Sequence, residues 1–180
     1  MKNCAHRASL VAIAVASVLY ATSAFATLPL AMTGRGAGTE TDVAGSCNGS
    51  GNSCNGSNCE CYPFSGTGTA TGVGAVTFST NLIVNKTSYE DNLLCEGSSG
   101  ILTLTQKLNS GNVLILDYQG LSCLDSAAEV FNGSFSIDGT NSLGKFAGAM
   151  GSGTMTGSVD ANSTVTLGNI NGTLLLAHHP

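Results

Sequence analysis

The feature that most constrains the fold of this chain is the alternation, from Tyr62 onward, of short apolar segments with turn residues. Stretches rich in Val, Ile, Leu, Thr and Phe are separated by Gly, Asn, Ser and Asp, which is typical of many short strands joined by tight turns. In the clearest pair, ILTLTQKL and VLILDYQG flank NSGN, and Leu102, Leu104 and Leu108 share one face of the first arm. No segment after Ala26 has a convincing 3.6-residue period with helix caps, so the pattern predicts an all-β protein.

The alternation predicts eight strands, at residues 64–72, 75–84, 100–108, 113–120, 130–138, 151–159, 164–167 and 172–177. Two of them share the motif G-[ST]-G-T-x-T-G, with Thr or Ser on one face and Gly, Ala or Met on the other, although the Gly- and Thr-rich composition alone also explains the repeat. Small residues on a concave face let strands bend and approach closely. We therefore predict a single antiparallel β-barrel of about eight strands. A β-sandwich is the alternative, because periodicity does not distinguish closure from two packed sheets.

Residues 1–26 have the features of a secretory signal peptide. Lys2 and Arg7 flank the start of a short apolar run, and Ala24-Phe25-Ala26 forms an A-x-A cleavage site. A membrane anchor is the alternative, but the run is short for a helix that crosses a bilayer. We predict a secreted or periplasmic protein with no membrane span after cleavage.

The rest of the chain divides into two parts by composition. Residues 27–61, rich in Gly, Ser and Asn, are predicted to form an irregular, disulfide-bearing leader without a core of its own. Residues 62–180 are predicted to form the β-barrel domain. The signal segment holds two of the six basic residues and none of the eleven acids, so the remainder has a formal charge of −7. Four scattered cations in an acidic chain exclude a nucleic-acid partner.

Six cysteines follow the predicted cleavage site: Cys47, Cys54, Cys59, Cys61, Cys95 and Cys123. An even count in an exported chain favours disulfides. The spacing C-x6-C-x4-C-x-C lacks the two close pairs of a structural zinc site, so we predict no metal and no cofactor. The preferred pairing joins Cys95 to Cys123 across the hairpin and pairs the four leader cysteines among themselves. A bond from Cys47 or Cys54 to Cys95 or Cys123 is the alternative.

Residues suited to catalysis are sparse. The histidines that follow the signal segment, His178 and His179, lie next to the C-terminus, where a frayed tail is expected, and the chain has no G-x-S-x-G elbow. Asp117, Glu129 and Asp138 are weak candidates for paired-carboxylate chemistry on a glycoside, because all three lie on or beside predicted strands. The alternative is that these acids are solvated residues at strand ends.

The C-terminal half, FNGSFSIDGTNSLGKFAGAMGSGTMTGSVD followed by NINGTLLL, resembles a pattern of small secreted bacterial β-proteins, G-x-F-x-G-A-x-G-S-G-T and then G-T-L. It is also similar to the allene oxide cyclase and dirigent superfamily of eight-stranded barrels, which has a GGTGRF-like turn. Here, at residues 140–146, Asn and Ser replace the paired glycines and Lys replaces Arg. The resemblance implies a barrel around an apolar cavity, in which dirigent proteins guide radical coupling and the cyclases fold a fatty-acid epoxide. Arg35 lies outside the predicted barrel, so no catalytic residue carries over.

Three functions are compatible with these observations. The leading hypothesis is an exported, non-catalytic binding or surface-interaction barrel whose partner the sequence does not identify. The second is a barrel that binds a small apolar ligand, with cyclase- or dirigent-like activity. The third is a secreted carbohydrate-active enzyme that uses Asp117 with Glu129 or Asp138. The sequence sets no oligomeric state.

Overall fold

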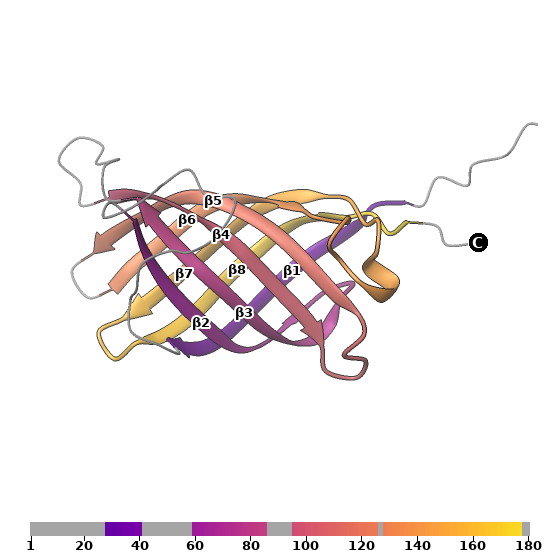
Figure 1. Ribbon diagram of the computed structural model, residues 1–180, viewed down its shortest axis with the longest axis horizontal. Helices are drawn as coiled ribbons and strands as arrows, with labels where there is room; N and C mark the ends of the chain where they lie inside the picture. The colour runs from indigo at the N-terminus through magenta and orange to yellow at the C-terminus, as the bar shows by residue number, and fades with distance from the viewer. Residues whose placement is uncertain (1–27, 41–58, 86–94, 126–127, 178–180) are drawn as a thin grey trace, which may run out of the picture.

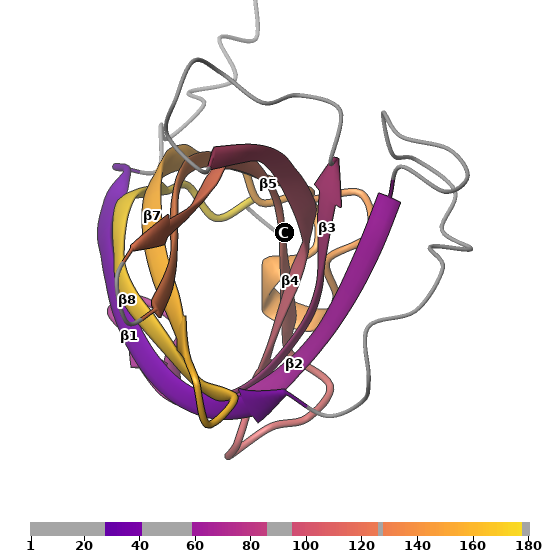
Figure 2. The same cartoon turned by 90° about the vertical axis from the view of Figure 1, so that its left-hand side faces the viewer.

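Eight antiparallel strands close into a single barrel. The structure, a computed structural model, describes residues 28–40, 59–85, 95–125 and 128–177. Each strand pairs with its neighbours in the sequence, and β1 pairs with β8 to close the ring (Figures 1 and 2). The strands are β1 (Leu30–Glu40), β2 (Cys59–Ala70), β3 (Gly74–Asn85), β4 (Cys95–Gln106), β5 (Val113–Asp125), β6 (Ala128–Ile137), β7 (Ser152–Asp160) and β8 (Thr164–Leu174). The predicted all-β barrel is confirmed, and the β-sandwich is excluded.

Large apolar side chains fill the interior of the barrel, whereas small polar ones cover its wall. The buried set includes Phe64, Phe78, Leu102, Leu104, Leu114, Leu116, Tyr118, Phe131, Phe135 and Met155. Outward positions are rich in hydroxyls; Thr67, Thr77 and Thr105, for example, lie side by side on β2, β3 and β4. The apolar face of every strand therefore points toward one shared core. No helix among the described residues is long and apolar enough to cross a membrane.

The barrel begins earlier than the sequence pattern predicted. β1 and the first residues of β2 fall within 27–61, which was predicted to be an irregular leader, and β1 pairs with both β2 and β8. That part of the domain boundary was therefore wrong. After Met32, the inward positions of β1 are mostly glycines, so the segment lacks the apolar alternation by which other strands are recognised. Residues 41–58 of the predicted leader and the predicted signal peptide lie outside the described residues.

Glycines form a close seam between β1 and β2. Gly38 lies directly opposite Gly66, and a Cβ atom built on Gly38 would lie 2.0 Å from the backbone oxygen of Ser65. A Cβ on Gly66 would lie 2.7 Å from the Phe78 ring, which packs against this seam. In the G-[ST]-G-T-x-T-G motif of β2, glycine faces inward and threonine outward, as the repeat predicted.

Replacing Gly38 with alanine is expected to lower the free energy of unfolding by roughly 1–3 kcal/mol, because the new methyl group meets backbone rather than a movable side chain. Gly157→Ala is the matched control on β7, since a Cβ there lies at an ordinary 3.4 Å from the Thr166 oxygen. Urea denaturation of both variants measures the difference. Equal stability of the two would contradict the close seam.

Two strand ends differ from the prediction. Residues 164–167 and 172–177, predicted as separate strands, belong to one strand, β8. In β8, Gly168 and Asn169 together oppose a single residue on each neighbouring strand, which is a β-bulge. The extra residue reverses the alternation, so Leu167 and Ile170 both point inward and the sequence pattern is interrupted. In addition, β4 ends at Gln106, and Leu108 is fully exposed in the loop beyond it rather than on the predicted face.

Candidate functional site

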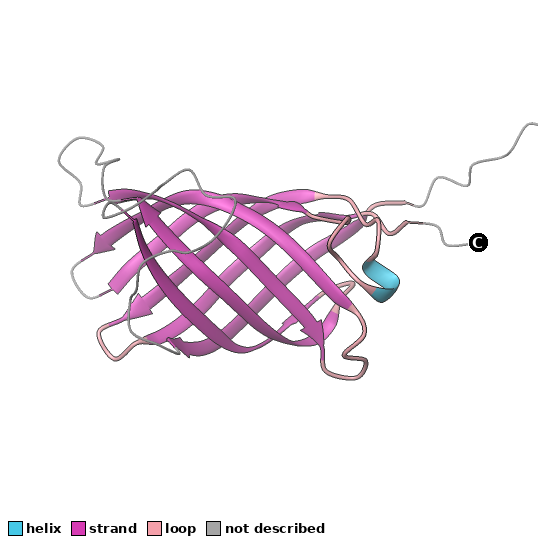
Figure 3. Cartoon of the chain, viewed as in Figure 1, coloured by secondary structure: helices cyan, strands magenta, loops and turns pink. Residues whose placement is uncertain are grey.

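One end of the barrel is closed by the segment 138–151, which connects β6 to β7. Within it lies the short 3-10 helix η2 (Gly144–Phe146), at the end of the barrel where β8 finishes (Figure 3). Phe146 is completely buried, and Ala149 beside it is almost so. We call this region the closed end. Within the predicted turn at 140–146, Ser142 and Phe146 are buried in the end of the barrel, whereas the other five residues are exposed.

Hydrogen bonds fasten the closed end to the barrel wall. The Ser142 hydroxyl donates to the Asp138 backbone oxygen at 2.7 Å and accepts from the Ile115 backbone N–H at 3.0 Å. The Lys145 backbone N–H donates to the Asn112 side-chain oxygen at 3.0 Å. A buried hydroxyl whose donor and acceptor are both satisfied holds its segment in one position. The segment 138–151 is therefore anchored to β5 and to the loop before it.

At the opposite end, which faces the viewer in Figure 2, four glutamates occupy inward positions. They lie where β1 ends and where β2, β4 and β6 begin, and each is in register with buried residues farther along its strand: Glu40, Glu60, Glu96 and Glu129. We call this group the acidic mouth. Among the described cations, Arg35 lies on the outer wall, and Lys107 and Lys145 lie beyond strand ends at the closed end. The two described lysines therefore lie at the end of the barrel opposite the acidic mouth.

A small cavity lies inside the barrel below the acidic mouth. It has a volume of about 50 Å³. Its lining is mainly apolar and includes Phe64, Phe78, Leu82, Leu102, Phe131 and Met155. Three polar side chains of the lining come from β3 and β5: Thr80, Tyr118 and Ser122. Because Glu129 lines the same cavity, the cavity and the mouth form one continuous site.

The Tyr118 hydroxyl is buried but satisfied. It lies 2.8 Å from the Thr80 hydroxyl, and the Tyr118 ring packs edge-on against Phe131 with 5.3 Å between ring centres. Burial raises the pKa of Tyr118 far above its ordinary value, which keeps the phenol neutral. Tyr118 therefore serves as part of the packed wall.

Ser122 is different, because its hydroxyl lacks a partner. The residue is 3% exposed, and its Oγ makes no hydrogen bond within the part of the chain that the structure describes. Ser122 lies near the Glu129 carboxyl and acts to lower its pKa, but the Ser122 Oγ does not meet that carboxyl at hydrogen-bonding geometry. An unsatisfied buried hydroxyl is uncommon and disfavours folding by about 1–3 kcal/mol.

Glu129 is a partly buried carboxylate of the acidic mouth that also lines the cavity. Burial raises the pKa of Glu129 above its ordinary value of 4.5, and the negative charges of Glu96, Glu40 and Glu60 raise it further. At the same mouth, the Tyr62 hydroxyl donates to the Glu60 carboxylate at 2.5 Å. Burial and this bond raise the pKa of Tyr62 well above its usual range. The mouth therefore has an excess of negative charge in a partly desolvated setting.

The raised pKa of Glu129 predicts a pH dependence of stability. The folded protein holds this proton more tightly than the unfolded chain, so the stability that Glu129 contributes is present below about pH 4.5 and is lost as pH rises through the folded pKa. Glu129→Gln should therefore stabilise the protein more at pH 7 than at pH 4.5, as measured by urea midpoints at the two values. Asp138→Asn is the control: hydrogen bonds from Asn141 lower the pKa of Asp138 below its ordinary 3.8, so its stabilising contribution is present at both pH values and this variant should lose about the same stability at each. A pH-independent effect of Glu129→Gln would contradict the prediction.

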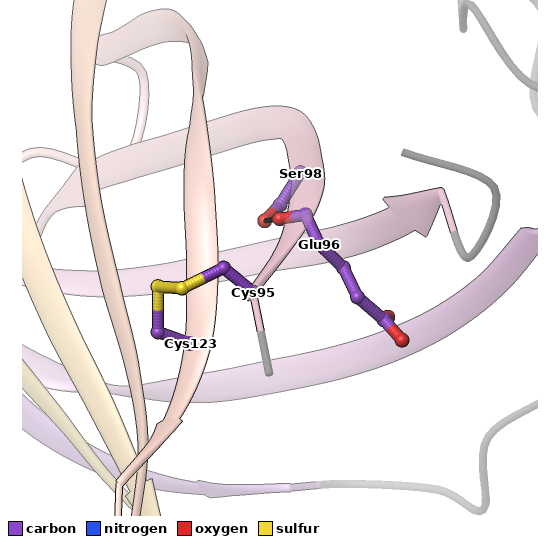
Figure 4. Close-up of a disulfide and its surroundings, with 4 residues drawn as sticks. All are labelled: Cys95, Glu96, Ser98 and Cys123. Atoms are coloured by element: carbon purple, nitrogen blue, oxygen red, sulfur yellow. Dashed lines mark hydrogen bonds between the residues drawn. A yellow bond between two sulfur atoms is a disulfide. The ribbon is translucent and has the colours of Figure 1, made fainter. Parts of the chain in front are cut away.

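The disulfide between Cys95 and Cys123 confirms the preferred pairing. The two residues are directly opposite each other on β4 and β5, beside the acidic mouth. Figure 4 shows the Glu96 side chain pointing away from the disulfide, as expected for the next residue of a strand. Cys59 and Cys61 are also disulfide-bonded. Cys47 and Cys54 lie outside the described residues, so the pairing among the leader cysteines stays a prediction.

The three carboxylates predicted for glycoside chemistry do not converge. Asp117 is exposed on the outer wall of β5, opposite Ser136, and Asp138 follows β6 at the closed end. The Asp138 carboxylate accepts hydrogen bonds from the Asn141 backbone and side chain at 3.1 and 2.6 Å, so it caps its own turn. Glu129 lies inside, at the opposite end of β6. His178 and His179 lie outside the described residues.

Most of the site was not recognised from the sequence. Of the acidic mouth only Glu129 was predicted as a candidate, and Ser122 was not selected. Strand alternation held a signal, since Glu96 is in phase with the buried Leu102 and Leu104, and Ser122 is in phase with Leu116 and Tyr118. These residues come from different strands, and only the closed strand order of the barrel brings them together.

Comparison with protein-family models, with curated proteins and with solved structures finds no match to this chain. The similarity of its C-terminal half to the allene oxide cyclase and dirigent superfamily stays a prediction. The turn at 140–146 that carries this similarity belongs to the closed end and lies away from the acidic mouth.

Proposed function

We propose that this protein is an exported, non-catalytic binding protein that receives a positively charged ligand at its acidic mouth. The observation that carries the proposal is the convergence of four inward glutamates at the one end of the barrel that the 138–151 segment does not close. Repulsion among these four carboxylates destabilises the ligand-free protein, and a bound cation relieves that repulsion. A concave, partly apolar site also strengthens the attraction between opposite charges.

The charge arrangement favours an organic cation over a metal ion. Within the described ranges, no three His, Cys, Asp or Glu side chains gather closely enough to hold a metal. A metal site needs several ligand atoms within about 2–2.6 Å of one point. Glutamates spaced around a rim match a larger cation that contacts them one or two at a time.

The two other hypotheses receive less support. The glycoside hydrolase hypothesis paired Asp117 with Glu129 or Asp138, whereas Asp117 and Asp138 both lie outside the cavity that Glu129 lines. A barrel that encloses a fatty acid or a phenol requires a pocket of roughly 300–1,000 Å³. The present cavity is far smaller, because aromatic and leucine side chains fill most of the interior.

A thermal-shift screen of the oxidised, signal-free protein tests the proposal. The probes are organic ammonium ions, calcium, neutral sugars, phenols and fatty acids. We expect the ammonium ions to raise the melting temperature, and the rise to shrink with added salt, because a ligand stabilises the native state by mass action and salt screens charges. No shift with any ammonium ion, or a shift with fatty acids or sugars instead, would overturn the proposal.

Charge-matched variants locate the binding site. Glu60→Gln combined with Glu96→Gln is expected to abolish most of the shift, since it halves the charge of the acidic mouth. The control combines Asp117→Asn with Asp138→Asn, which removes the same number of charges from outside the cavity. An equal loss in both variants would indicate a general effect of net charge rather than a site.

A further inference from the structure

We propose that the ligand is a slender aliphatic amine, whose ammonium group lies between Glu129 and Ser122 and whose alkyl chain enters the cavity below them. This inference rests on the proposed function and specifies the chemistry of the ligand. It joins two features that the charge of the mouth alone does not explain. These are the apolar void inside the barrel and the unpartnered Ser122 hydroxyl.

The volume and lining of the cavity set the shape of the apolar part. About 50 Å³ exceeds the roughly 10–15 Å³ that a cavity needs to hold one water and is about a third of a 150 Å³ cavity that holds benzene. The cavity therefore takes the end of an alkyl chain but not an aromatic ring. Phe64, Leu102 and Met155 offer this chain only apolar contacts.

The Ser122 hydroxyl supplies the polar contact at the inner edge of the mouth. It is buried, lines the cavity and has no hydrogen-bond partner among the residues described. One ammonium N–H donates to the Ser122 oxygen, and another donates to the Glu129 carboxylate nearby. One ligand nitrogen thus satisfies the hydroxyl and pairs with the charge.

The groups that face Glu129 explain why the ligand should be an amine rather than an alcohol or an acid. Glu96, Glu40 and Glu60 contribute negative charge at Glu129, and Tyr62 stays a neutral phenol. An alkyl carboxylate would add a further negative charge to this site. A neutral alcohol of the same length would fill the cavity without relieving the repulsion.

An NMR titration of the oxidised protein at pH 7 tests the inference with methylammonium, n-propylammonium, n-propanol and butyrate. Burial of a methylene contributes about a fourfold gain in affinity, so two buried methylenes should make n-propylammonium bind roughly 15-fold more tightly than methylammonium. The amide signals of Ser122 and Glu129 should shift on titration, and n-propanol and butyrate should bind at least tenfold more weakly. This series uses the unaltered protein, so it does not depend on the folding of any variant.

A cavity-filling variant distinguishes the contribution of the alkyl chain to binding from the contribution of the ammonium charge. Gly157 lines the cavity, and a Cβ there meets no atom closer than 3.4 Å, so the side chain of Gly157→Val should occupy the void. This variant should bind methylammonium as before but lose the gain of roughly 15-fold for n-propylammonium. Ser122→Ala should weaken both amines, with Ser134→Ala on the outer wall as the control.

The outcomes distinguish this inference from the proposed function. Equal affinity for methylammonium and n-propylammonium, or an unchanged gain in Gly157→Val, would overturn the alkyl-chain inference and leave a cation-binding mouth. Failure of every ammonium ion to bind would overturn both. Tighter binding of n-propanol than of n-propylammonium would overturn both as well, because it would show an apolar cavity without charge recognition.

Discussion

Replacing Phe146 with alanine is expected to lower the free energy of unfolding by roughly 3–5 kcal/mol. Phe146 is 0% exposed, and its ring closes one end of the barrel, where the connection between β6 and β7 turns across the core. Truncation removes the buried ring and leaves a void that the surrounding strands cannot fill, because their hydrogen-bonded register resists collapse. Urea denaturation with a fixed m-value measures the loss.

Leu143→Ala in the same segment is the matched control. Leu143 is 54% exposed, and its contribution to the closed end is a backbone bridge to Val113 that alanine preserves. Its replacement should change stability by no more than about 0.5 kcal/mol. If Phe146→Ala lowered the free energy of unfolding no more than Leu143→Ala, burial of the Phe146 ring would not stabilise the closed end. Amine binding at the acidic mouth should survive in Phe146→Ala at temperatures where the variant remains folded, since the two ends are separate.

The second large effect concerns the disulfide between Cys95 and Cys123. Serine at both positions is expected to lower the free energy of unfolding by about 3.5 kcal/mol, because the bond closes a loop with a sequence separation of 28. The double substitution avoids leaving a lone thiol. Denaturant titration at constant pH gives the difference, and m should rise if the unlinked chain unfolds to a more expanded ensemble.

A cross-strand pair farther along the same two strands provides the control for this prediction. Ser99 and Gln119 are also directly opposite on β4 and β5, without a covalent link, and alanine at both should cost less than about 1 kcal/mol. Loss of the disulfide should also weaken amine binding, because Glu96 and Ser122 are the pair next to it. A stability change below about 1 kcal/mol in the double serine variant would show that the pairing of β4 with β5 stabilises this part of the barrel without the disulfide.

Local patterns predicted much of the wall. Strands such as β4 and β5 were recognised because leucines alternate with polar residues at the period of a strand, and this periodicity is a property of neighbours in the chain. β1 was missed because closure requires glycine at its inward positions, where apolar side chains would normally mark a strand. β8 was divided in two because the bulge at Gly168 reverses the alternation. Both errors arose at positions where packing against a neighbouring strand, and not the local alternation, decides which residue type is present.

The site was predicted less completely than the wall. The pairing of Cys95 with Cys123 followed from their positions at the two ends of one hairpin, which is a local relation. The selection of Glu129 as a candidate carboxylate was useful, but Asp117 and Asp138, its expected partners, lie outside the cavity. Its neighbours at the mouth come from β1, β2 and β4, which are distant in the sequence.

By itself, the sequence determined an all-β chain, most of its strands and the separation of apolar and polar faces, and it favoured the hairpin disulfide that the structure shows. Each of these follows from residues close together in the chain or from an alternation of two. Only the tertiary structure decided that β1 meets β8, that Phe146 closes one end, and that four glutamates and Ser122 gather at the other. The physical reason is that all the strands together set the closure and the register of the barrel. The negative charge of the mouth therefore arises from several strands of the closed ring and from no single segment.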